Sequence, residues 1–155
     1  MDATTFQEMY DFFLAGVTDD MFLELTPDET SGILRELLVS AIPYFEFPKE
    51  EITLDLTNER FNRHLTSEEM MIIRQYMIVE WIGYQLASVE NVRQKYSGSE
   101  FSFTSQASHM DKLMKMREQY RETGFKLQRL YNRRKVTKNG HVVSSLASIM
   151  EPPEE

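Results

Sequence analysis

The stretch Ser105–Arg134, SQASHMDKLMKMREQYRETGFKLQRLYNRR, predicts one uninterrupted helix that decides the fold. At 1.5 Å rise per residue, this helix would be about 45 Å long. Residues that recur at three- and four-residue steps line up on one face: Ala107, Met110, Leu113, Met114, Arg117, Tyr120, Gly124, Leu127 and Tyr131. A helix this long exceeds what the core of a small domain needs. We therefore expect its surfaces to contact other copies or other proteins.

Three shorter helices are predicted upstream, because the same start signal occurs three times. A capping box pairs a threonine with a glutamate three residues later, at Thr5–Glu8, Thr26–Glu29 and Thr66–Glu69. These signals predict helices from residue 6 to about 16, from 27 to Pro43, and from 67 to about 95, with a short helical turn within 18–25. The helix from 67 is apolar on more than one face, which is typical of a central helix, and we expect it to bend near Gly83.

The segments between and after the helices carry extended patterns. Residues 44–58 predict an extended link with one short strand, and Phe101–Phe103 predicts an extended lead into the long helix, with Thr104 or Ser105 as its cap. Asn139-Gly140 between β-branched residues predicts a hairpin. The C-terminal arm that contains this hairpin, residues 136–155, could add to the surface of a partner or remain an unattached terminus.

The predicted fold is all-α: a bundle of about four main helices, including the long C-terminal one, followed by a short β-hairpin or extended arm. We expect residues 1–135 to form the helical domain and residues 136–155 to form the arm and tail. The predicted core comprises Leu34, Leu37, Met77, Trp81, Leu113, Tyr120 and Leu127. The other methionines of the last two helices, such as Met70, Met71, Met110, Met114 and Met116, are interpreted as core filler.

Composition excludes several classes of protein. The 155 residues, 41% of them hydrophobic, suffice for one folded domain. The chain contains no cysteine, which rules out disulfides, thiolate catalysis and zinc–sulfur sites. It begins Met1-Asp2-Ala3-Thr4 without a signal-peptide pattern, and no apolar run is long enough to span a membrane. We therefore expect a soluble protein made in the cytoplasm.

The net charge of −8 conceals a strong polarity along the chain. Residues 1–60 contain 14 acidic and three basic residues, whereas residues 105–138 contain three acidic and ten basic residues. These opposite charges could pair one copy head to tail with another, or each could be a solvated face.

No pattern typical of an enzyme occurs. The histidines His64, His109 and His141 lie in different segments, without a second ligand three or four residues away. The acidic pairs Asp19-Asp20, Glu50-Glu51 and Glu68-Glu69 point apart if they lie on helices, so we assign them structural or solvation roles. We predict no catalytic residue, no metal ligand and no cofactor.

The basic cluster at the end of the long helix has two interpretations. Cations favour a helix C-terminus by about 0.3–1 kcal/mol each, which accounts for some members of the cluster. The cluster could instead contact acidic groups, whether on a neighbouring copy, on an acidic partner or in DNA, although no sequence-reading motif accompanies it. We predict a partner or oligomer interface that also includes two residues of the hairpin: Arg129, Arg133, Arg134, Lys135, Lys138, Val142 and Val143. The alternative function is a small regulatory helical protein that binds nucleic acid through this basic end.

Several segments together carry a family resemblance. They are a capped acidic helix, the helix end Ser40-Ala41-Ile42-Pro43, the segment Val79-Glu80-Trp81-Ile82, and Phe101-Ser102-Phe103-Thr104-Ser105-Gln106-Ala107-Ser108-His109 before a Lys/Arg-rich helix closing on Arg129-Leu130-Tyr131. Over residues 4–134 the chain resembles the small head-to-tail connector (neck or adaptor) proteins of tailed bacteriophages, particularly those of Gram-positive hosts. The residues after Lys135 lie outside the resemblance.

The resemblance implies a structural virion protein at the head–tail junction. Such a subunit forms a homo-oligomeric ring, often of twelve copies, beneath the portal protein. A tail or stopper (collar) protein would bind below it, and genomic DNA would pass through the centre without being read. The resemblance implies no membrane partner and no catalytic signature.

Overall fold

A computed structural model of the chain describes residues 2–17, 26–95, 103–136 and 142–144. Of the described positions, 71% are helical, which confirms the mainly helical fold. The α-helices are α1 (Phe6–Leu14), α3 (Pro27–Ala41), α4 (Ser67–Lys95) and α5 (Phe103–Arg133), with a 3₁₀ turn η1 (Ile42–Tyr44) after α3. Two antiparallel strand pairs join β1 (Leu54–Asp55) to β2 (Arg60–Phe61) and β3 (Arg134–Val136) to β4 (Val142–Ser144).

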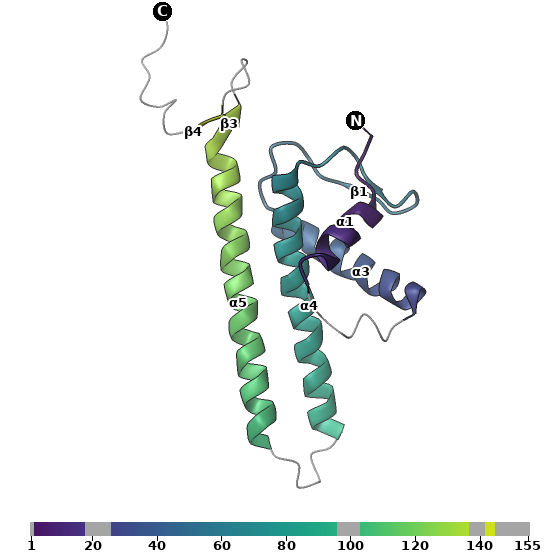
Figure 1. Ribbon diagram of the computed structural model, residues 1–155, viewed down its shortest axis with the longest axis vertical. Coiled ribbons are helices and arrows are strands. Elements are labelled where there is room, and N and C mark those ends of the chain that lie inside the picture. The colour runs from purple at the N-terminus through teal and green to yellow at the C-terminus, as the bar shows by residue number, and fades with distance from the viewer. Residues whose placement is uncertain (1, 18–25, 96–102, 137–141, 145–155) are drawn as a thin grey trace, which may run out of the picture.

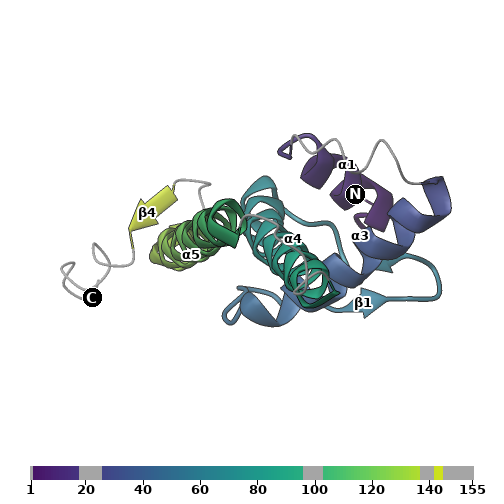
Figure 2. The same cartoon turned by 90° about the horizontal axis from the view of Figure 1, so that it is seen from below.

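Helix α4 is the centre of the molecule. It runs antiparallel beside α5, while α1 and α3 lie across its other side (Figure 1). Seen along the long axis, α5 and the pair α1–α3 flank α4 from opposite sides (Figure 2). This position agrees with the expectation that a helix with several apolar faces lies in the middle. The second half of α4 and the first half of α5 continue together beyond the body formed by α1 and α3 (Figure 1).

All three predicted capping boxes are confirmed. The threonine hydroxyl accepts the amide of the glutamate at 3.2 Å in Thr5–Glu8, and at 3.3 Å in both Thr26–Glu29 and Thr66–Glu69. The glutamate carboxylate accepts the threonine amide in return, at 2.7, 2.9 and 2.9 Å. Because both partners of each box lie within one turn, local sequence was sufficient to predict these starts.

Several helix bounds differ from the prediction. Phe103, Thr104 and Ser105 are already helical in α5, so the extended conformation predicted at Phe103 and the cap predicted at Thr104 or Ser105 are wrong. Phe101 and Ser102 lie outside the described residues. The long helix propagates through these residues because their helix propensity is only modestly below average. Helix α3 ends at Ala41, and Pro43 lies inside η1, since its fixed φ suits a tight turn that cannot continue as an α-helix. The turn predicted within 18–25 lies outside the described residues.

The link between α3 and α4 contains a hairpin, where the sequence predicted one strand. The Asp55 carboxylate accepts the amides of Thr57 and Asn58 at 3.2 and 3.0 Å, and this closes the turn between β1 and β2. Glu59 adopts φ 49°, a left-handed conformation in a turn that lacks glycine. The N-terminal residue Thr4 joins the hairpin, because its carbonyl accepts the Phe61 amide at 2.8 Å. The hairpin thus ties the chain start to the body.

One hydrophobic core joins all four helices. Of the predicted core residues, Leu34, Leu37, Met77, Trp81 and Leu113 are buried, whereas Tyr120 and Leu127 are half-buried and pack against the same core. Several fully buried members come from the N-terminal part of the chain and from the hairpin: Phe6, Met9, Phe13, Leu38, Phe61 and Leu65.

Helices α4 and α5 approach closely where Tyr76 faces Gly124. A Cβ atom added to Gly124 would lie 2.9 Å from Cζ of Tyr76. The tyrosine ring has little freedom to move, because it stacks on Tyr44 at 5.2 Å and its hydroxyl accepts Nε2 of Gln128 at 2.5 Å. Glycine is therefore required here for helix contact.

We expect Gly124→Ala to lower the free energy of unfolding by about 1–3 kcal/mol, because the added methyl group forces a clamped ring to shift. The matched control is Gly32→Ala in α3, where nothing lies within 4 Å of the added atom. That change should stabilise the protein by about 0.8–1.0 kcal/mol through helix propensity. Urea unfolding followed by circular dichroism measures both. Equal stability of the two variants would contradict the close contact.

Candidate interaction surfaces

The basic residues predicted as an interface gather at the C-terminal end of α5. Arg129 and Arg133 are exposed on the helix, and the Arg129 guanidinium lies 5.9 Å from the centre of the Phe125 ring. Arg134 is also exposed, and it forms an ion pair with Glu68 at the start of α4. Lys135 lies in β3, and Lys138 lies outside the described residues. The structure therefore places four of the five basic residues at one end of the molecule.

The strands after α5 pair as the sequence predicted. Lys135 lies opposite Val143, and Val136 lies opposite Val142. The connecting residues 137–141, which include the Asn-Gly pair, lie outside the described residues. The predicted interface residues Val142 and Val143 are thus placed beside the basic end of α5.

Opposite charges lie on opposite sides of α4. Helices α1 and α3 contain five acidic residues and one basic residue, a net charge of −4. Helix α5 contains seven basic and three acidic residues, a net charge of +4. Helix α4 lies between the acidic pair α1–α3 and the basic helix α5 (Figure 2), so the two net charges lie on opposite sides of the central helix.

A buried carboxylate joins the start of α4 to the end of α5. Glu69 is 2% exposed. Its two oxygens accept the Arg63 guanidinium at 2.7 and 2.9 Å, and the Tyr131 hydroxyl also donates to Glu69 at 2.7 Å. Burial alone would raise the pKa of Glu69, but its bonds from Arg63, Thr66 and Tyr131 lower it to about 2. The same burial, with the adjacent carboxylate, raises the pKa of Tyr131 to about 12.

The segment after η1, residues 45–51, is held against α5 by this network and by Gln128. The Gln128 side chain accepts the Glu46 amide at 3.1 Å and donates to the Tyr44 carbonyl at 2.9 Å. The Lys49 amide donates to the Tyr131 hydroxyl at 3.1 Å, and the Lys49 ammonium lies 4.5 Å from the centre of that ring. Between these anchors, Phe47 is 68% exposed. The segment is therefore a fixed loop with an aromatic side chain at its surface.

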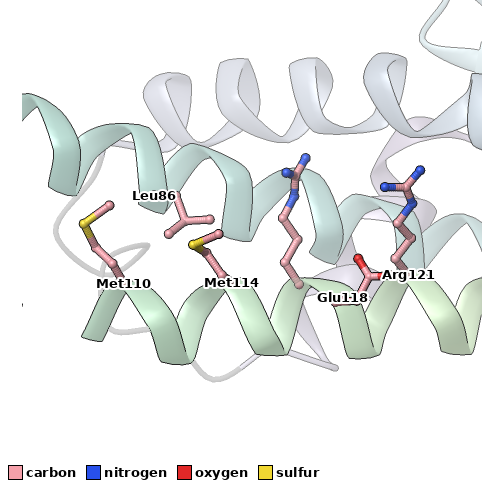
Figure 3. A pocket seen from close by; sticks show the side chains of 6 residues that line it. Leu86, Met110, Met114, Glu118 and Arg121 are labelled. Carbon is pink, nitrogen blue, oxygen red and sulfur yellow. The ribbon is translucent and has the colours of Figure 1, made fainter. Parts of the chain in front are cut away.

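A groove runs along one side of the α4–α5 pair. Its outer part is a cavity of about 390 Å³ lined by Leu86, Met110, Met114, Arg117, Glu118 and Arg121. The methionines of α5 and Leu86 of α4 point toward one another in this cavity (Figure 3). Glu118 and Arg121 also line the next cavity, of about 530 Å³, beside Tyr44 and Phe125.

The exposure of the methionines corrects one interpretation. Met77 is fully buried, but Met114 is 59% exposed and Met71 is 38% exposed, so these two are not core filler. Met114 lies on α5, which packs mainly against α4, and Met71 lines an open cavity between α4 and α5.

The described residues bring no metal ligands together. Within the described ranges, no three His, Asp or Glu side chains form a group that could hold a metal ion. His64 and His109 are exposed in separate parts of the molecule, and Asp19-Asp20 lies outside the described residues. Glu69 is occupied by its capping box and by Arg63. None of the described helices is both long and apolar enough to cross a membrane.

Comparison with known proteins adds no family to this description. No protein-family model, no curated protein and no solved structure matches the chain.

Three features of these surfaces were missed in the sequence. The Arg63–Glu69–Tyr131 network joins residues that are up to 68 positions apart, so only its Thr66–Glu69 part had a local signal. Phe47, flanked by Glu46 and Pro48, has no periodic pattern that would indicate exposure. The exposure of Met114 depends on which side of α5 packs against α4, since its neighbour Leu113 is buried.

Proposed function

We propose that this chain is a structural subunit of a ring that joins the head of a tailed bacteriophage to its tail. In this proposal, the four helices act as one bundle that packs against identical neighbours. The ring docks beneath the portal protein, and a tail or stopper protein binds its other side. Genomic DNA passes through the centre without sequence-specific contacts, and the protein resides at the head–tail junction of the virion.

The observation that carries the proposal is that α4 separates the net-acidic helices α1 and α3 from the net-basic helix α5. A molecule with complementary surfaces on opposite sides can bind a second copy head to tail and still have one surface of each kind free. Such heterologous contacts continue until the rotation between neighbours closes a ring. The resemblance of residues 4–134 to connector proteins supports the same conclusion from the sequence.

Native mass spectrometry of the full chain over a range of concentrations tests the proposal. We expect monomer and one closed oligomer of fixed copy number, with dissociation promoted by salt because charged faces meet. A monomer at every concentration, or a continuous series of masses without a preferred one, would overturn it.

The competing function is a regulatory protein that binds nucleic acid through the basic end of α5. The exposure of Arg129 and Arg133 is the observation that favours it. Titration with duplex DNA at two salt concentrations separates the two functions, because a phosphate-binding protein loses affinity steeply as salt rises. We expect weak binding with a shallow salt dependence. Tight binding with a steep slope would favour the regulatory function.

A further inference from the structure

Two exposed features of the chain are complementary in kind, a projecting aromatic side chain and an open apolar cavity. One is the exposed side chain of Phe47 on the fixed loop 45–51, and the other is the cavity around Met114 in the groove of α4 and α5. An exposed aromatic residue and an open apolar cavity are each typical of protein–protein contacts.

The loop presents Phe47 in a preorganised form. Phe45, two residues before it, is buried and packs edge-on against Tyr131 at 5.5 Å. The amides of Glu46 and Lys49, on either side of Phe47, are held by side chains of α5. Little conformational freedom is therefore left to lose when the aromatic ring is buried by a partner, and this favours binding.

The cavity suits an aromatic ring. Its apolar wall is formed by Leu86, Met110 and Met114 (Figure 3), and methionine side chains adapt to the shape of a bound group. Arg117 and Arg121 lie next to this wall with one acidic residue, Glu118.

The charges around the two features are also complementary. Glu46, Glu50 and Glu51 lie in the same loop as Phe47 and are exposed, and Glu50 also pairs with Arg63 at 3.5 Å. With the one cation of the loop, Lys49, these residues give residues 45–51 a net charge of −2. An acidic loop would thus meet a cavity with two arginines against one glutamate.

The same chain cannot bring the two together. The amide next to Phe47 is bound to Gln128, and Gln128 lies 14 residues beyond Met114 along α5. At 1.5 Å per residue, this separation is about 21 Å. Phe47 of the same chain therefore does not fill the cavity around Met114.

We propose that Phe47 of one copy inserts into the Met110–Met114 cavity of the next copy. This inference rests on the proposed function only in requiring contact between copies. It assigns that contact to two different surfaces, the Phe47 loop and the Met110–Met114 cavity, and every chain has one of each. The interface is therefore heterologous, and a pair of bound chains still has one free loop and one free cavity that can bind further copies.

Cross-linking tests the contact directly, because the chain has no native cysteine. Full-length Phe47→Cys and Met114→Cys are prepared separately, mixed, and treated with a short bis-maleimide reagent. Both positions are exposed, so circular dichroism should show an unchanged fold. We expect a covalent heterodimer in the mixture and little homodimer with either variant alone.

The matched control replaces Phe47→Cys with Val39→Cys, an exposed position on α3 outside the loop. The Phe47–Met114 pair should give at least about tenfold more heterodimer than this control, since a bound pair has a high effective concentration. Yields equal to the control, or cross-links from Met114→Cys to another part of the chain, would overturn the inference.

Light scattering of the unmodified protein measures whether the chain assembles at all, independently of the cross-link. The proposed ring and the proposed Phe47 contact can therefore fail separately. If the chain assembles but the Phe47–Met114 pair does not cross-link above the control, the ring stands and this interface is wrong. If the pair cross-links but no closed oligomer forms, the contact stands and the ring is wrong.

Discussion

Replacing Glu69 with alanine is expected to lower the free energy of unfolding by about 3–5 kcal/mol, the cost of removing the buried partner of an ion pair. Glu69 is 2% exposed and binds Arg63 through both oxygens, at 2.7 and 2.9 Å. Its removal leaves the guanidinium, the Tyr131 hydroxyl and the amide of Thr66 without their shared acceptor. Urea unfolding measured by circular dichroism gives the change.

The neighbouring residue Glu68 supplies a matched control. It forms an ion pair with Arg134, but both side chains are close to half-exposed. Glu68→Ala should therefore cost less than about 1 kcal/mol, as is usual for surface ion pairs. A similar loss of stability in the two variants would show that Glu69 does not join α4 to α5 in the way we describe.

The pH dependence of stability gives the Glu69 prediction a second test. The pKa of Glu69 is lowered from 4.5 to about 2 in the folded protein. Its contribution is thus fully present above pH 4.5 and is lost as the pH falls through about 2. We expect the stability difference between the wild type and Glu69→Gln to shrink over this acid range. A difference that stays constant would contradict the lowered pKa.

Replacing Trp81 with alanine is expected to cost about 3–5 kcal/mol, because a large side chain leaves a cavity in a close-packed core. Trp81 is 2% exposed and belongs to the core that joins all four helices. Its ring stacks on Tyr84 at 5.6 Å. The urea midpoint should fall while its slope stays the same, because the change affects stability and not the surface exposed on unfolding.

Tyr84 is the matched control for Trp81, since it is an aromatic residue on the same helix that is 45% exposed. Tyr84→Ala should cost clearly less than Trp81→Ala, because much of its ring already contacts solvent. Equal costs would show that the core does not extend to Trp81 as described.

The sequence predicted the features that depend on neighbouring residues. The three capping boxes, the long helix α5 and the strands β3 and β4 each have a signal within a few residues. The central position of α4 followed from its apolar residues on several faces. These predictions needed no knowledge of how the elements pack.

Features that depend on packing could not be predicted. The turn between β1 and β2 uses Asp55 and a left-handed Glu59, so the usual glycine signal is missing. The exposure of Met114, next to the buried Leu113, depends on which side of α5 packs against α4. The position of Phe47 depends on bonds to Gln128 and Tyr131, which lie about 80 residues away in the sequence.

Electron microscopy of the assembled full-length chain tests the central claim most directly. Class averages viewed along the symmetry axis should show closed rings of one copy number around an opening wide enough for duplex DNA. Isolated monomers, compact particles without a central opening, or open filaments would contradict a ring subunit at the head–tail junction.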